Sequence, residues 1–108
     1  MGSKLKRIKC LAMEGLVAEG AETIEEVEKG PVRDAMLIVG AQKVEHYEIA
    51  TYGSLITIAQ SLGYDDAVQL FKETLAEEKG ANDKLNKVAL TQVNKEALAQ
   101  ARATEPAE

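Results

Sequence analysis

The sequence predicts an all-α protein built on a long antiparallel helical hairpin with short flanking helices. Only 4% of the 108 residues are aromatic and two are proline, a composition that disfavours sheets and disorder. From Val32 a helical pattern continues until Leu62-Gly63, a typical helix end. The three residues Gly63-Tyr64-Asp65 then lead into a second helical stretch. So short a link makes the two helices antiparallel neighbours.

The first 29 residues predict a short helical segment over residues 4–29. Its apolar rhythm is interrupted by Gly15 and Gly20, which favours one helix near residues 9–18 and a separate turn at 22–27. Cys10 and Met13 are expected to pack as small, adaptable hydrophobes. Gly30-Pro31 marks the end of this segment and the start of the next helix, because proline suits the first position of a helix.

A long helix over residues 31–62 and a second over 65–90 form the predicted hairpin, with Asp65 as a candidate N-cap. Thr91 and Asn94 are cap candidates for a short terminal helix over residues 94–102. We interpret the whole chain, residues 1–108, as a single domain.

The charge balance excludes some classes of partner. Eighteen acidic against thirteen basic residues give a net charge of −5, the wrong sign for binding nucleic acid or an anionic membrane surface. No apolar run approaches the ~18 residues of a membrane span. One cysteine cannot form an intramolecular disulfide, so we expect a reducing, cytoplasmic location.

Acidic residues interrupt the apolar seam of both long helices. On a heptad grid the seams read Ile38, Ala41, Glu45, Glu48, Tyr52, Leu55, Ala59, Leu62 and Phe71, Leu75, Glu78, Asn82, Leu85, Ala89. Burying an ionised carboxylate without a partner costs several kcal/mol. Glu48 and Glu78 each lie fifteen positions from Gly63. An antiparallel hairpin therefore places them at one level, with Glu45 near Asn82.

Inward carboxylates at one level of a helical bundle are typical of di-iron and di-manganese sites. His46, on the neighbouring stripe, either completes such a site or faces another helix. Two other interpretations remain open. Lysine or arginine side chains such as Lys43, Lys79 or Arg33 could pair with the carboxylates. Alternatively, a slight rotation of the seam would leave Glu45 and Glu48 at its solvent edge.

Four segments resemble the YciE/YciF family of bacterial stress-response proteins, which belongs to the ferritin-like superfamily. They are CLAMEGLVAEG (10–20), GPVRDAMLI (30–38), QKVEHYEIATYG (42–53) and ETLAEEKGANDKL (73–85), followed by Val93-Asn94. The resemblance implies a four-helix bundle with a carboxylate-rich di-metal centre of iron or manganese. Carried over by position, its ligands are Glu45, Glu48 and Glu78.

Two departures from the family pattern matter. The family has two further long helices ahead of the Cys10 block, and this sequence has too few residues before Cys10 to form them. The family also commonly has aspartate where this chain has Asn82. Asn82 still offers an oxygen, but without charge. A further difference is Gly80, in place of a better helix former.

The hairpin is thus expected to be a ferritin-like half bundle, which dimerisation completes to four helices. We expect a homodimer or a higher even oligomer whose chains share one centre. The expected function is that of a ferritin-like stress-response protein handling oxidants or iron, and, if it is an enzyme, a di-metal oxidase or a peroxide-consuming enzyme. Tyr52, on the carboxylate seam, is expected to pack and to hydrogen-bond a carboxylate. The alternative is a non-enzymatic oligomeric scaffold whose inward carboxylates are structural.

Overall fold

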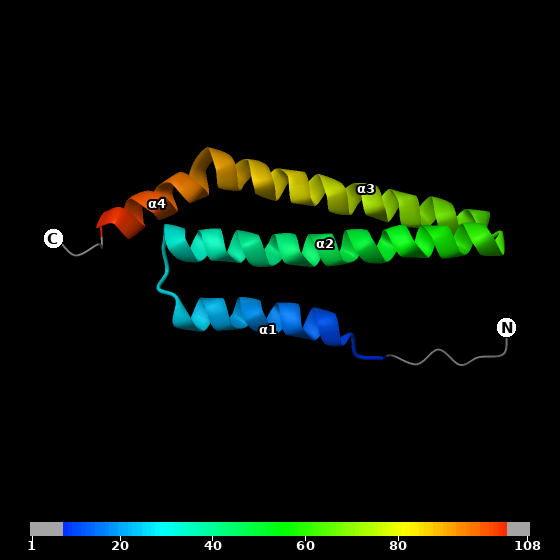
Figure 1. Cartoon of the computed structure of the whole chain (residues 1–108), viewed down its shortest axis with the longest axis horizontal. Helices are drawn as coiled ribbons and strands as arrows, with labels where there is room; N and C mark the ends of the chain where they lie inside the picture. The colour runs from blue at the N-terminus through cyan, green and yellow to red at the C-terminus, as the bar shows by residue number, and fades with distance from the viewer. Residues whose placement is uncertain (1–7, 104–108) are drawn as a thin grey trace.

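The structure, a computed structural model, describes residues 8–103. Its elements in chain order are α1 (Leu11–Glu26), α2 (Pro31–Leu62), α3 (Asp65–Val88), the π-helical turn η1 (Ala89–Val93) and α4 (Asn94–Ala103). The all-α prediction is confirmed over this part of the chain. α2 and α3 form the antiparallel hairpin, and α1 lies along the opposite side of α2 (Figure 1).

α2 begins and ends at the residues that the sequence indicates. Pro31 occupies its first turn, and Gly63 ends it in the left-handed conformation with φ of 75°. The amide of Tyr64 donates to the carbonyl of Ala59 at 3.0 Å, which satisfies a carbonyl that the helix end would leave free. α3 begins at Asp65, whose carboxylate lies in the first turn rather than at the cap, where it favours the helix dipole.

α1 is one continuous helix, so the predicted division into a helix and a separate turn is wrong. Gly15 and Gly20 cost only about 1 kcal/mol each inside a helix, too little to break one that packs against α2. The helix begins after Cys10, whose Sγ accepts from the amide of Met13 at 3.4 Å. Residues 4–7 of the predicted segment lie outside the described residues.

The short terminal helix predicted over residues 94–102 is present as α4, but no break separates it from α3. The helix continues through η1 into α4, and the hydroxyl of Thr91 donates back to the carbonyl of Lys87 at 2.8 Å instead of capping a new helix. Asn94 likewise has helical angles, φ −64° and ψ −36°. The chain bends at η1 and carries α4 towards the start of α2 (Figure 1). There the Oε1 of Gln100 accepts from the amide of Val32 at 3.3 Å.

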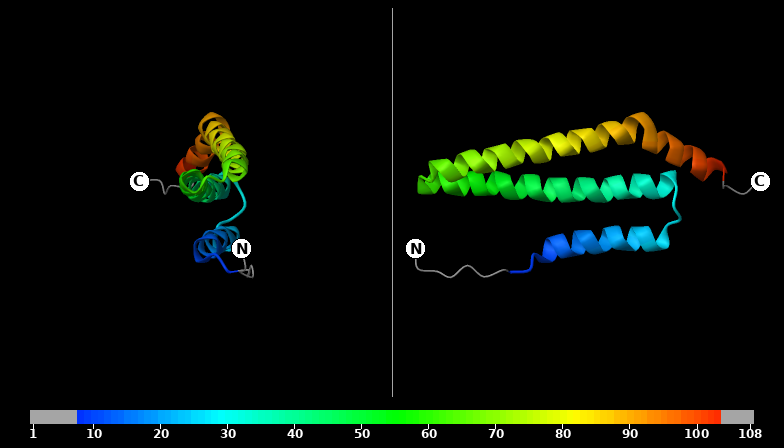
Figure 2. Two further views of the ribbon diagram at one scale, coloured as in Figure 1. Left: turned by 90° about the vertical axis from the view of Figure 1, so that its right-hand side faces the viewer. Right: turned by 180° about the vertical axis from the view of Figure 1, so that it is seen from behind.

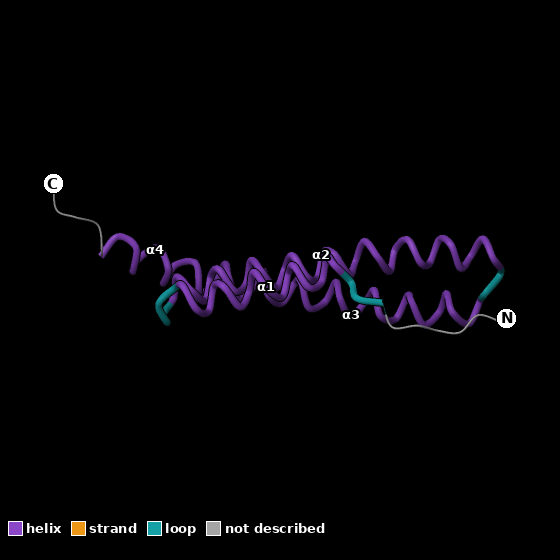
Figure 3. Tube along the Cα trace, turned by 90° about the horizontal axis from the view of Figure 1, so that it is seen from below, coloured by secondary structure: helices purple, strands orange, loops and turns teal. Residues whose placement is uncertain are grey.

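The described helices form a single layer with α2 in the middle (Figure 2). Its extents are 67 × 28 × 18 Å. Seen from below, α2 and α3 cross at a small angle (Figure 3). Within residues 8–103 the buried side chains are Ile56, Ala59, Val68 and Ala89. Most apolar side chains on α2 therefore have no second layer above them.

Candidate metal centre

The acidic residues of the two predicted seams are partly shielded from solvent. Glu45, Glu48, Glu78 and Asn82 are all half-buried. Their apolar neighbours on the seam, such as Leu75 and Leu85, are half-buried too, whereas Leu62 at the end of α2 is 59% exposed.

Glu45 on α2 and Glu78 on α3 influence each other electrostatically across the hairpin. The carboxyl of Glu78 raises the pKa of Glu45 to about 7, first by sharing a hydrogen bond with it. Burial raises this pKa further, and so do the negative charges of Glu78 and Glu48. The Glu45 carboxyl is therefore partly protonated near neutral pH. Glu78 thus acts on Glu45, whereas the counting from Gly63 had placed it level with Glu48.

Two oxygen atoms of this cluster are buried without a hydrogen-bond partner. They are the Oε2 of Glu45 and the Oδ1 of Asn82. A buried acceptor without a donor costs about 1–3 kcal/mol. Carboxylate and amide oxygens are the ligands that hard cations such as Mn²⁺ and Mg²⁺ prefer, and they also serve Fe²⁺ in carboxylate-bridged sites. The donor set therefore fits a divalent cation.

His46 does not join the cluster. It is exposed, and its Nδ1 lies 2.7 Å from the carbonyl oxygen of Gln42 on its own helix. Among residues 8–103, no three histidine, cysteine, aspartate or glutamate side chains are grouped closely enough to hold a metal ion. Within these residues, the structure thus does not bring Glu45, Glu48 and Glu78 together as a group of three ligands.

The cations that could have paired with the carboxylates are engaged elsewhere or exposed. Lys43 forms an ion pair with Glu19 on α1, with Nζ and Oε2 3.3 Å apart. Arg33 donates to the carbonyl of Ile24 at 3.3 Å, and Lys79 is exposed. The structure gives no ion pair that neutralises Glu45 within its described part, so the interpretation as buried salt bridges finds no support.

A contact that the sequence analysis did not anticipate joins α1 to α2. The Sγ of Cys10 lies 2.9 Å from the Oη of Tyr47. This hydroxyl, followed by the amide of Met13, lowers the pKa of the Cys10 thiol. Cys10 is exposed and serves as a helix cap, so the expectation that it packs as a hydrophobe is wrong. In the sequence, the position of Cys10 near the start of a helix was the signal for its capping role. Its contact with Tyr47 depends on how α1 packs against α2.

Tyr52 packs against Phe71 within the hairpin. Their ring centroids are 6.1 Å apart and the ring planes are tilted by 46°, a favourable aromatic arrangement. Tyr52 thus packs in the hairpin as expected, whereas the structure gives no hydrogen bond from its hydroxyl to a carboxylate among the described residues.

Over the same part of the chain, no helix combines the length and the apolar character needed to cross a lipid bilayer.

Comparison with known proteins identifies relatives over most of the chain. Protein YciF of Escherichia coli (strain K12) is 60% identical over 94 residues, which are 87% of this chain and 57% of that protein. The crystal structure of the E. coli stress protein YciF matches with a TM-score of 0.80 and 58% identity, covering 87% of this chain and 59% of that one. YcfI from Rhodopseudomonas palustris, described as a candidate structural protein, matches with a TM-score of 0.75 and 49% identity, over 82% of this chain and 56% of its own.

The chain thus spans less than three fifths of the length of each of these relatives. Residues 1–98 also match the family model described as a domain of unknown function, DUF892. The resemblance to the YciF group is confirmed, and the chain belongs to the DUF892 family.

Proposed function

We propose that this stress-family protein binds divalent iron or manganese at the α2–α3 interface, through Glu45, Glu78 and Glu48 with Asn82 beside them. The observation that carries the proposal is the pair of buried, unpartnered oxygens on Glu45 and Asn82. A cation between them would satisfy both atoms and offset the repulsion that raises the pKa of Glu45.

The raised pKa of Glu45 would also make metal binding depend on pH. Glu45 has a pKa of about 7, chiefly because of Glu78, so its carboxyl is partly protonated near neutral pH. Glu45 and Glu78 would hold the cation as anionic ligands, so a cation would compete with the proton on Glu45 and bind more weakly as the pH falls. Asn82 would contribute a neutral oxygen. A bound iron pair would supply redox chemistry towards dioxygen or peroxide, which fits oxidant or iron handling in a stress response.

Thermal unfolding with added metal tests this proposal. Saturating Mn²⁺ or Fe²⁺, the latter under anaerobic conditions, should raise the melting temperature of the parent, because a ligand that binds only the folded state stabilises it. Glu45→Gln and Glu78→Gln should each abolish the rise. Glu73→Gln is the matched control, since Glu73 is an exposed glutamate on the same helix as Glu78. An unchanged melting temperature with Fe²⁺, Mn²⁺ and Zn²⁺ would refute the proposal.

A second candidate function is a non-enzymatic scaffold whose carboxylates are structural. It is favoured by the lack of a three-residue ligand group among residues 8–103 and by the likeness to YcfI, a candidate structural protein. Glu48→Ala separates the two functions. Loss of bound metal with an unchanged oligomer supports the metal centre, whereas dissociation of a parent that holds no metal supports the scaffold.

A further inference from the structure

A groove of about 510 Å³ lies between α1 and α2. Its floor is formed by half-buried apolar side chains, among them Leu16 and Val27 of α1 and Leu37 and Val44 of α2. Sites for small molecules are typically apolar clefts of roughly 300–1,000 Å³ with a few polar groups that fix the orientation of the ligand. The groove is therefore large enough, and apolar enough, to hold a small organic molecule.

The two rims of the groove differ in chemical character. The exposed residues along them are Glu19, Glu22 and Glu26 on α1 and Lys43, Val39 and Met36 on α2. On each helix they are spaced three and four residues apart, so they share one face of that helix. α1 and α2 run antiparallel (Figure 1), and Glu19 forms an ion pair with Lys43. Counted from this pair, Glu22 is level with Val39 and Glu26 is level with Met36.

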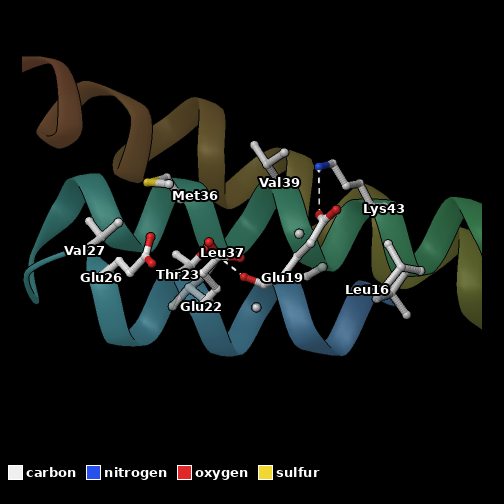
Figure 4. Close-up of a pocket in the computed structure, with 14 residues that line it drawn as sticks. Leu16, Glu19, Glu22, Thr23, Glu26, Val27, Met36, Leu37, Val39 and Lys43 are labelled. Carbon is white, nitrogen blue, oxygen red and sulfur yellow. Dashed lines mark hydrogen bonds and ion pairs between the residues drawn. The ribbon is translucent and has the colours of Figure 1, made fainter. Parts of the chain in front are cut away.

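The ion pair at one end of the groove is not repeated along it. Figure 4 shows Glu19 reaching from α1 to Lys43 on α2, where Oε2 and Nζ are 3.3 Å apart. Among residues 8–103 the structure gives no ion pair to Glu22 or Glu26. The apolar side chains opposite them, Val39 and Met36, are 54% and 44% exposed. Carboxylates without cations thus lie beside apolar side chains without cover.

Two glycines leave the floor of the groove open. Gly20 of α1 and Gly40 of α2 both line it, and a Cβ added at either position would meet no atom within 4 Å. Glycine inside a helix is less favourable than alanine, and the packing of α1 on α2 does not require it at either position. The absence of these two side chains leaves room for a ligand to approach the backbone closely.

We propose that the groove between α1 and α2 binds a small amphipathic amine, with its protonated amino group at Glu22 and Glu26 and its hydrocarbon body on the apolar floor. The two glutamates are about 6 Å apart along the helix axis, so one ammonium group with three donors can reach both carboxylates. An anionic head group would instead be repelled by them.

Lys43 provides an internal example of this recognition. Its side chain is itself an alkylammonium, and it is held at the edge of the same groove by Glu19. No residue that lines the groove belongs to the carboxylate cluster of Glu45, Glu48 and Glu78. The amine site is therefore separate from the proposed metal function and does not rest on it.

Isothermal titration calorimetry in the presence of EDTA tests the class of ligand. Octylammonium, which is protonated at about pH 7, should bind the parent with one site per chain. Octanoate and 1-octanol carry the same hydrocarbon body with an anionic or a neutral head group, and butylammonium carries the same head group with a shorter body. Each of these three probes should bind at least about tenfold more weakly than octylammonium.

A matched pair of charge variants tests where the amino group lies. The double variant Glu22→Gln and Glu26→Gln should weaken the binding of octylammonium about tenfold, since two exposed ion pairs are lost. The double variant Glu25→Gln and Glu28→Gln changes the net charge equally at exposed glutamates that do not line the groove, and it should bind octylammonium like the parent.

A matched pair of leucine variants tests where the hydrocarbon body lies. Gly20→Leu should fill the groove and abolish the binding of octylammonium. Gly15→Leu adds the same side chain to the same helix at an exposed position outside the groove, and binding should be kept. Leucine favours a helix more than glycine does, so both variants should keep their helical content in circular dichroism.

Several results would overturn the proposal. They are the absence of octylammonium binding to the parent, octanoate binding as tightly as octylammonium, equal losses in the two charge variants, and unchanged binding in Gly20→Leu. A groove covered by a second copy of the chain or by another protein segment would leave octylammonium unbound, and that result also counts against the amine site. Because EDTA is present throughout, each of these failures would leave the metal function standing.

Discussion

Glu45 on α2 and Glu78 on α3 lie close enough for the carboxyl of Glu78 to raise the pKa of Glu45 to about 7. This proximity is unfavourable when both groups are ionised, and the structure offers Glu45 no ion pair among its described residues to offset it. The hairpin therefore carries a stability cost at the place where two further oxygen atoms are left without donors. Such a cost is typical of a binding site, which is less stable empty than filled.

The first prediction concerns pH. Glu45 has a pKa of about 7 in the folded protein, raised from an ordinary value of 4.5. The folded state thus binds more protons than the unfolded chain between these values, and the stability this gives is complete below about pH 4.5 and lost as the pH rises through about 7. The melting temperature of metal-free protein should therefore contain a component that falls between pH 5 and pH 8.

Glu45→Gln should remove that component, because a neutral amide does not titrate in this range. Differential scanning calorimetry at several pH values measures it, with Glu73→Gln as the exposed control. Equal pH dependence in the parent and in Glu45→Gln would contradict the assignment of the raised pKa to Glu45.

The second prediction concerns Asn82. Asn82→Asp adds a negative charge at a buried oxygen one helical turn after Glu78 on α3. We expect the metal-free protein to lose about 1–2 kcal/mol of stability and the dissociation constant for Mn²⁺ to fall about tenfold, because ligand charge sets cation affinity. Chemical denaturation and Mn²⁺ titration followed by electron paramagnetic resonance measure the two effects. A variant with lower affinity for Mn²⁺ would show that residue 82 lies outside the coordination shell.

The third prediction concerns the turn of the hairpin. Gly63 has φ of 75°, which a residue with a Cβ adopts at a cost, so Gly63→Ala should destabilise the protein by about 1–2 kcal/mol. Gly15→Ala in α1 should instead stabilise it by about 0.5–1 kcal/mol, because Gly15 is exposed and an added Cβ meets no atom within 4 Å. Urea denaturation compares the two variants. Equal effects of the two changes would contradict the left-handed conformation at Gly63.

The fourth prediction concerns the attachment of α1. The Cys10 thiol both caps α1 and contacts Tyr47, so Cys10→Ala should speed amide hydrogen exchange throughout the first turns of α1. Cys10→Ser should exchange more slowly than Cys10→Ala, since a hydroxyl can accept the same amide proton. Tyr47→Phe removes only the contact between helices and should affect α1 less than Cys10→Ala does. Unchanged exchange in Cys10→Ala would show that other contacts hold α1.

Local signals in the sequence were sufficient for the hairpin. Pro31 and Gly63 define both ends of α2, because their backbone requirements are properties of the residues themselves. The inward position of Glu45, Glu48 and Glu78 followed from the heptad spacing, and the structure finds all three half-buried. The heptad spacing predicts which residues are half-buried here because both helices are long.

Features that depend on packing between helices could not be predicted from the sequence in the same way. The sequence suggested that Gly15 and Gly20 divide α1, but contact with α2 outweighs their small intrinsic cost. The π-helical turn η1 replaced a predicted break because α4 packs against the start of α2, where Gln100 accepts from Val32. The proximity of Glu45 and Glu78 depends on the register of the hairpin, which a count from Gly63 fixes only to within one turn.

The most direct test of the central claim is elemental analysis combined with native mass determination on protein purified without chelators. The account predicts iron or manganese bound to the parent in stoichiometric amount, and its loss from Glu45→Gln and Glu78→Gln while Glu73→Gln keeps it. A metal-free parent that also takes up neither ion on addition would contradict the claim that these inward carboxylates form a metal site.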